Sequence, residues 1–159
     1  MAFPLPARTV LRAGTWSGPT ADTVRLSYDE RFLRRKRLLC EGGAGVMVDL
    51  AATTSLEAGD ALETDDGQRI RVVAADEPVV QVRGENLARL AWHIGNRHTP
   101  CQVAKDHLVI RQDHVLEAML AQLGARLAHV IAPFHPEGGA YGHGRTLGHD
   151  HAPHGFPHG

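Results

Sequence analysis

The sequence is poor in aromatic residues, cysteines and long apolar runs, and each shortage excludes a class of protein. Aromatic residues make up 5% of the 159 residues, so a core must be built from Leu, Val, Ile and Ala. The two cysteines, Cys40 and Cys101, lie too far apart for a disulfide framework. No segment approaches the roughly 18 apolar residues of a membrane helix, and Pro4 and Pro6 interrupt a possible signal peptide. We therefore expect a cytoplasmic protein that does not enter a membrane.

The sequence also lacks an excess of charge of either sign. Lys and Arg total 17, Asp and Glu total 18, and the formal net charge is −1. A dedicated nucleic-acid-binding protein usually carries a strong basic excess, so we expect no nucleic-acid partner. Histidine is the abundant type, with 11 residues. The composition is that of an ordinary globular protein, and the abundance of histidine makes imidazole side chains the first candidates for function.

The first half of the chain has the pattern of strands and turns. Thr23–Tyr28 alternates polar and apolar residues, as a half-buried strand does. Asp65-Asp66-Gly67 separates two strand-like stretches and is typical of a hairpin turn. No long helical period occurs before residue 84. We predict a small all-β domain over residues 1–75.

The second half changes pattern near Pro78, which disfavours helix at the preceding residue. Two apolar faces with helical spacing alternate with four short apolar stretches, which predicts the order β-α-β-β-α-β of a ferredoxin-like domain over residues 76–134. The fold class is therefore α+β, and a small sheet with an open face or edge favours dimerisation. The expected strands are 79–82, 101–104, 108–111 and 127–132; the helices begin after Asn86 and Asp113 and end at Gly95 and Gly124.

The periodicity stops after Ala132, and residues 135–159 are rich in His, Gly and Pro. Such a segment buries too little apolar surface to fold, so we expect a flexible tail. A His-rich tail is typical of transition-metal binding, whereas a solvated tail without ligands and an engineered tag are the alternatives. Its histidines are His135, His143, His149, His151, His154 and His158.

His98 stands directly after the first expected helix, in the segment Gly95-Asn96-Arg97-His98-Thr99-Pro100. A histidine there can interact with the helix dipole or can bind a metal ion, and the sequence leaves both interpretations open. In a symmetric dimer, a residue near the two-fold axis meets its own copy. Two His98 imidazoles would then share one ion, and the site would form only on dimerisation.

These segments together resemble the UreE family of urease accessory proteins. The segment GNRHTP after Ala91-Trp92-His93-Ile94 is the most specific feature, and the resemblance covers nearly the whole chain. The other matching segments are Leu62 with Asp65-Asp66-Gly67 and Ile70-Arg71-Val72, Asp113-His114-Val115-Leu116 with Met119-Leu120 and Leu123-Gly124, and Pro133-Phe134-His135-Pro136-Glu137 with Gly139-Ala140-Tyr141.

The resemblance implies a homodimeric, cytoplasmic nickel metallochaperone. It would deliver Ni(II) to the urease apoprotein complex together with the GTPase UreG and the other accessory proteins. His98 matches the family histidine that both chains contribute at the dimer interface, and His114 matches a second histidine that binds metal in some members. Family tails do not align residue by residue; we select His149 and His151 because Asp150 lies between them. Imidazole also suits Zn(II) and Cu(II), which are alternative ions in vitro.

Several other residues invite a functional interpretation but have structural alternatives. Cys101, three residues after His98, is a possible ligand, yet a free cysteine packs like a small apolar residue and we favour the core. We expect Cys40 to be buried or inert. We expect His93 at the surface or an interface, His107 in solvent and His129 in a structural role. Arg31, Arg34, Arg35, Lys36 and Arg37 form a basic run that is either a solvated face or a docking patch for an acidic partner.

Four functions remain to be compared. The first hypothesis is nickel donation by histidine ligands, and the alternative is storage or detoxification by the His-rich tail alone. A metal-dependent hydrolase using His98 and His114 is less favoured, because no HExxH, GxSxG, P-loop or dinucleotide motif occurs. We therefore expect no enzyme. A scaffold that acts through the basic run is the fourth.

Overall fold

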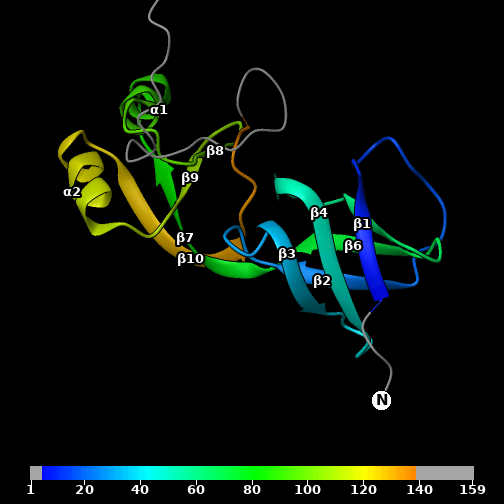
Figure 1. Ribbon diagram of the computed structural model, residues 1–159. Coiled ribbons are helices and arrows are strands. Elements are labelled where there is room, and N and C mark those ends of the chain that lie inside the picture. The colour runs from blue at the N-terminus through cyan, green and yellow to red at the C-terminus, as the bar shows by residue number, and fades with distance from the viewer. Residues whose placement is uncertain (1–4, 139–159) are drawn as a thin grey trace, which may run out of the picture. The chain divides into compact units, whose positions relative to one another are not determined.

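The computed structural model describes residues 5–138. The chain divides into two compact units between Asp76 and Glu77. Each unit has its own sheet, and the second, coloured from green to orange in Figure 1, contains both helices. No helix in this part of the chain is long and apolar enough to cross a membrane.

The first unit is all-β, as predicted. Its six strands form one sheet in the order β2-β6-β5-β1-β4-β3. The expected hairpin joins β5 and β6, and Gly67 provides the left-handed backbone of its turn at φ +85°. The strands are β1 Leu5–Leu11, β2 Asp22–Leu26, β3 Phe32–Leu39, β4 Gly45–Ser55, β5 Ala61–Thr64 and β6 Arg69–Ala74.

The core of this unit consists of small aliphatic side chains, in line with the scarcity of aromatic residues. Val24, Val48, Leu62 and Val72 are fully buried, and each such side chain contributes roughly 1.5–3 kcal/mol relative to an exposed one. The sequence-based prediction missed β1 and β3. The central residues of β3 are all exposed and basic, so the strand has no alternating pattern that would reveal it.

The second unit has the predicted order β-α-β-β-α-β. Its sheet has the strand order β10-β7-β9-β8, which is the ferredoxin-like arrangement, and confirms the α+β fold class. Val80, Leu108 and Ile110 of the sheet pack with Leu90 and Ile94 of the first helix in one core. The elements are β7 Asp76–Arg83, α1 Leu87–Asn96, β8 Gln102–Val103, β9 Leu108–Arg111, α2 His114–Gln122 and β10 Arg126–Pro133.

The topology brings three segments to one end of this unit. β9 is antiparallel to both β7 and β8, so β7 and β8 run in the same direction. α1 must therefore return to the end where β8 starts, and α2 begins at that same end, where β9 stops. We call this the His98 end, comprising residues 97–102, 112–115 and 134–137.

Candidate metal centre

The C-terminus of α1 places His98 in an unusual backbone conformation. The helix does not stop at Gly95, as the sequence suggested, but continues to Asn96. The amide of Arg97 donates to the carbonyl of Ile94 at 3.1 Å, and that of His98 donates to the carbonyl of Gly95 at 2.9 Å. His98 then adopts φ 55°, in the left-handed region.

This conformation is usually given to glycine, because a Cβ atom crowds the backbone there. For an ordinary residue the left-handed region costs about 1–2 kcal/mol, and helices most often end on glycine at this position. Within residues 5–138, His98 is the only non-glycine residue with positive φ. Its side chain is exposed, so packing does not explain the choice of histidine. Backbone strain held in place at an exposed residue favours a functional role.

His114 is the first residue of α2, and the cap of that helix fixes its position. The Asp113 carboxylate oxygen Oδ1 accepts hydrogen bonds from the amides of Val115 at 3.0 Å and Leu116 at 3.1 Å. The amide of Asp113 donates to Glu117 Oε2 at 2.9 Å. This confirms the predicted cap. His114 itself is exposed at the His98 end, as His98 is.

His93, His107 and His129 each have a structural partner in the second unit. The centroids of the His93 and Trp92 rings lie 5.0 Å apart, with the two ring planes nearly perpendicular. His107 is partly buried rather than solvated, with 19% of its side chain exposed, and its Nδ1 lies 2.7 Å from Asp106 Oδ1. This hydrogen bond lowers the pKa of the Asp106 carboxyl. His129 pairs with Glu117, which agrees with a structural role.

Cys101 packs against the core of the second unit. It packs against the cluster of Val80, Ile94 and Leu120, as the apolar alternative predicted. Burial is the main cause that raises the pKa of its thiol to about 11, and the nearby Glu137 carboxylate acts in the same direction. The thiolate that binds metals is therefore scarce at neutral pH. Cys40 is buried in the first unit, as expected, and burial raises the pKa of its thiol also.

The chain leaves the second unit beside Cys101 and Gln102. The amide of His135 donates to Gln102 Oε1 at 2.9 Å, and the amide of Glu137 donates to the Cys101 carbonyl at 2.8 Å. Phe134 is fully buried. Sequence patterns missed the role of Gln102, because the hydrogen bond joins residues 33 positions apart. His149 and His151 lie outside the described residues.

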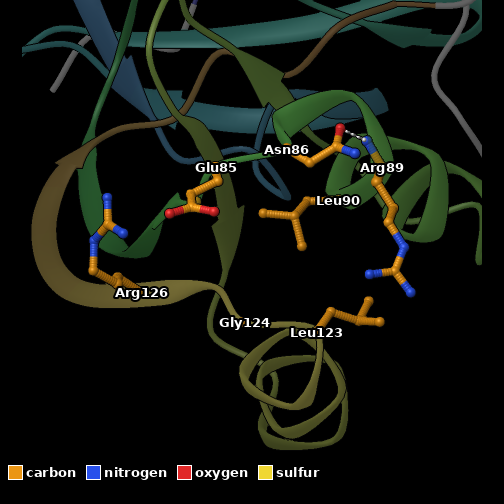
Figure 2. A pocket seen from close by; sticks show the side chains of 8 residues that line it. Glu85, Asn86, Arg89, Leu90, Leu123, Gly124 and Arg126 are labelled. Carbon is orange, nitrogen blue, oxygen red and sulfur yellow. Dashed lines mark hydrogen bonds between the residues drawn. The ribbon is translucent and has the colours of Figure 1, made fainter.

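Within residues 5–138, no three His, Cys, Asp or Glu side chains are grouped so that they could hold a metal ion. A hollow of about 280 Å³ exists in this unit, but it lies at the opposite end, beside the start of α1 and the end of α2. Figure 2 shows Glu85, Arg89 and Arg126 around it, with the Asn86 side chain capping α1 by a 3.1 Å bond to the Arg89 amide. No histidine or cysteine lines this hollow.

Apolar side chains are exposed near the His98 end. Trp92 on α1 is 62% exposed, and Val115 on α2, beside His114, is 66% exposed. Large apolar side chains at the surface of a small domain are typical of interaction sites when they gather around one feature. Val115 directly follows His114, and Trp92 lies on α1, the helix that leads to His98.

The basic run of the first unit separates into a structural and a surface part. Arg31 is buried: its guanidinium donates to the Leu26 carbonyl at 3.1 Å and stacks over Tyr28. The other four residues are exposed on β3. Arg34 donates to the Leu50 carbonyl, and Arg35 lies 3.2 Å from Asp49. Lys36 and Arg37 contact no carboxylate of the described chain.

Comparison with known proteins gives matches over both units. The model of the N-terminal domain of the UreE urease accessory protein matches residues 4–75, and that of its C-terminal domain matches residues 77–159. A urease accessory protein UreE from Cereibacter sphaeroides is 64% identical over 147 residues, covering 92% of this chain and 80% of its own. One from Ruegeria pomeroyi is 58% identical over 148 residues, covering 92% and 99%.

Proposed function

This chain belongs to the UreE family of urease accessory proteins, and from that premise we propose that it binds Ni(II) through histidines and donates it to the urease active site. The family implies a role in urease maturation. The proposal adds that the cargo is Ni(II), that histidines are its ligands and that the ion passes from this chain to urease. In this proposal the transfer takes place in the cytoplasm.

The observation that carries the proposal is the exposed, left-handed His98. The strain in its backbone and the absence of packing around its side chain are explained if the imidazole must reach a ligand. One imidazole holds a metal ion weakly. A second copy of the chain, related by a two-fold axis at the His98 end, would supply the second imidazole. The exposed Trp92 and Val115 are apolar groups that such a homodimer would bury.

Further ligands in this proposal are His114 and the tail histidines His149 and His151. Imidazole ligands suit nickel and also accept Zn(II) or Cu(II) in vitro. A donor must release its ion, and histidine ligands that leave one at a time permit release more readily than a closed thiolate cage. Since a ligating imidazole must be neutral, nickel affinity falls as the pH falls through the range in which imidazoles are protonated.

The domains divide the work in this proposal. Residues 76–134 bind metal and dimerise, and residues 135–159 form the metal-binding tail. Residues 1–75 dock onto the urease apoprotein complex, with UreG and the other accessory proteins as partners. The exposed basic side chains of β3, Lys36 and Arg37 above all, provide a surface for an acidic partner.

Storage of nickel by the tail alone is the second candidate, because six histidines lie in residues 135–159. Native mass spectrometry separates the two functions. Nickel is added to the full chain and to its His98→Ala variant, and the ion count and the oligomer mass are read together. Donation predicts a dimer with one tightly held nickel ion that the variant loses.

Storage predicts that both chains bind the same number of ions with the same affinity. A nickel affinity that stays constant between about pH 8 and 5.5 would exclude histidine ligands altogether. His98→Asn serves as a further control, because asparagine tolerates the left-handed backbone but offers no imidazole.

A further inference from the structure

We propose that the exposed edge of β3 binds an acidic, extended segment of a partner protein as an added strand of the first sheet. The inference deepens the docking proposed for the first unit and rests on it. It adds the conformation of the partner segment and the backbone atoms that hold it, and it does not depend on nickel binding. We call the backbone N–H and C=O groups of Arg35, Arg37 and Leu39 the open edge.

β3 is an outer strand of its sheet, and its pairing with β4 determines which of its backbone groups remain free. Within the described chain, β4 lies on one side of β3 and no strand lies on the other. The amide of Cys40 donates to the Ala44 carbonyl at 2.8 Å, so these two residues form a hydrogen-bonded pair where the hairpin closes. In an antiparallel ladder, hydrogen-bonded pairs alternate with pairs that are not hydrogen-bonded.

This alternation assigns the backbone groups of β3 to its two sides. Leu38, two residues before Cys40, lies opposite Val46 in the next hydrogen-bonded pair. Lys36 lies opposite Val48 in the one after that. The residues of the open edge fall between these pairs, so their N–H and C=O groups point away from β4. Such a row of backbone groups is a template for one more strand.

The side chains along this strand are exposed and positively charged. Residues 34–37 are all basic and exposed. Lys36 and Arg37 contact no carboxylate of the described chain. Neighbouring side chains of a strand point to opposite faces of the sheet, so these two cations stand on different faces. An added strand would therefore meet a positive charge on either face.

The same charges decide which kind of strand can pair here. A second copy of β3 would place cations opposite cations, which is destabilising, and charged edge strands resist pairing with one another for this reason. A strand that carries glutamate or aspartate at these positions brings opposite charges together instead. At the two ends of β3, Phe32 is 44% exposed and Leu39 is 75% exposed. A segment with an acidic centre between apolar residues therefore fits the whole strand.

Strand addition differs from ordinary charge attraction because backbone hydrogen bonds supply part of the affinity. In an antiparallel added strand, the residue opposite Arg37 directs its own N–H group towards β3 and its side chain to the same face as that of Arg37. The residues on either side of it direct their N–H groups away. Blocking one set of amides or the other therefore separates the two kinds of binding.

The test uses the full chain and a capped, fluorescently labelled peptide as long as β3, eight residues, in which glutamate and threonine alternate. One version is N-methylated at every glutamate and a matched version at every threonine, so each lacks the amide protons of one side. Fluorescence anisotropy gives the dissociation constants. Amide hydrogen exchange of the protein is followed with and without the unmodified peptide.

We expect methylation at the glutamates to weaken binding at least tenfold, because several hydrogen bonds are lost together, and methylation at the threonines to weaken it less than twofold. Exchange should slow at the amides of Arg35, Arg37 and Leu39 and stay unchanged at Lys36. A loss confined to the threonine-methylated peptide would also support an added strand, in the parallel direction. Equal effects of the two methylations, or no slowing at the open edge, would overturn the proposal.

The charges are tested by changing Lys36 and Arg37 together to threonine, which favours strands and carries no charge. We expect peptide binding to weaken about tenfold, whereas Arg89→Thr with Arg126→Thr, the control for net charge, should leave it unchanged. An oligodeoxythymidine of equal charge that binds as tightly as the peptide would overturn the acidic strand.

Failure of the added strand can be told apart from failure of the proposed docking. If the two methylations act equally but charge reversal at Lys36 and Arg37 still weakens binding to the urease apoprotein complex, side-chain attraction alone accounts for the docking. If charge reversal leaves that binding unchanged, the docking role of β3 fails and the added strand fails with it. Nickel binding by the second unit is unaffected by either result.

Discussion

His98 holds a surface position where glycine would be less strained, and the two properties of that residue can be tested separately. The backbone conformation belongs to the end of α1, where the amides of Arg97 and His98 close the last turn. The imidazole projects from that turn into solvent. A substitution that changes the backbone preference therefore tests the strain, and one that removes only the imidazole tests the proposed metal binding.

Replacing His98 with Gly removes the Cβ atom that crowds the left-handed backbone. We expect the free energy of unfolding to rise by about 0.5–1 kcal/mol, less than the full strain because glycine is also freer in the unfolded chain. His98→Ala keeps a Cβ and should show no such gain, while both variants lose the tight nickel ion. Urea unfolding followed by circular dichroism gives the comparison. A His98→Gly chain less stable than His98→Ala would mean that no strain is present.

The Cys101 thiol makes stability depend on alkaline pH. Its pKa is raised to about 11 in the folded protein, above the ordinary value of 9.0, so the folded state holds the proton more tightly. The contribution of the protonated Cys101 thiol to the free energy of unfolding is therefore complete below pH 9, and it is lost as the pH rises towards 11. We expect the urea midpoint to fall between about pH 8.5 and 10.5 under reducing conditions, and to fall less in Cys101→Ser. Cys40, whose pKa is also raised, accounts for part of the remaining slope. Identical slopes in the two chains would contradict the burial argument.

At the scale of elements, the start of α2 determines where His114 stands. The first turn of a helix has free amide groups, and the Asp113 carboxylate accepts from two of them. The Glu117 side chain returns to the Asp113 amide and also pairs with His129 of β10. One short network thus joins the cap, the helix and the strand beside it.

Asp113→Ala should lower the free energy of unfolding by about 1 kcal/mol and loosen the turn that carries His114. Asp113→Asn keeps the oxygen acceptor and should have little effect. Thermal unfolding measures the loss of stability, and amide hydrogen exchange at Val115 and Leu116 measures how far the turn is loosened. If Ala and Asn behave alike, the carboxylate oxygen does not act as the cap.

At the scale of the whole molecule, the two units carry different chemistry. The first unit has exposed cations on β3 and no histidine among residues 5–75. All described histidines lie in the second unit, which also exposes Trp92 and Val115. The docking proposed for the first unit and the metal binding proposed for the second can therefore be tested by separate mutations.

Reversing the charge of Lys36 and Arg37 together should weaken docking to the urease apoprotein complex while leaving the nickel count unchanged. The reason is that exposed charges mainly steer association, so the association rate and its salt dependence should both decrease. Biolayer interferometry at several salt concentrations measures them. Arg89→Glu with Arg126→Glu changes the net charge equally, in the second unit, and is the control. An equal effect of the two pairs would indicate net charge rather than the β3 surface.

Local patterns determined much of the fold before any tertiary contact was known. Asn86 and Asp113 were predicted as caps because their side chains act on amides two or three residues away, and both do so. Gly67 and Gly124 were predicted to end elements because their backbones need no distant partner, and both adopt positive φ. The βαββαβ order followed from apolar periodicity, which local sequence contains.

Features that depend on distant residues were decided by the tertiary structure alone. The four exposed basic residues gave no sign of β3, which is a strand because β4 pairs with it. In the sequence nothing distinguishes Arg31 from the other residues of the basic run, whereas in the structure it is buried against Leu26 and Tyr28. Gln102 holds a residue 33 positions away. The sequence by itself determined which residues carry imidazole side chains and which residues cap the helices, since both depend on the residue itself and its near neighbours. Packing and antiparallel pairing decided that His98, His114 and residues 134–137 share one end, since the order of strands in a sheet is a property of the whole chain.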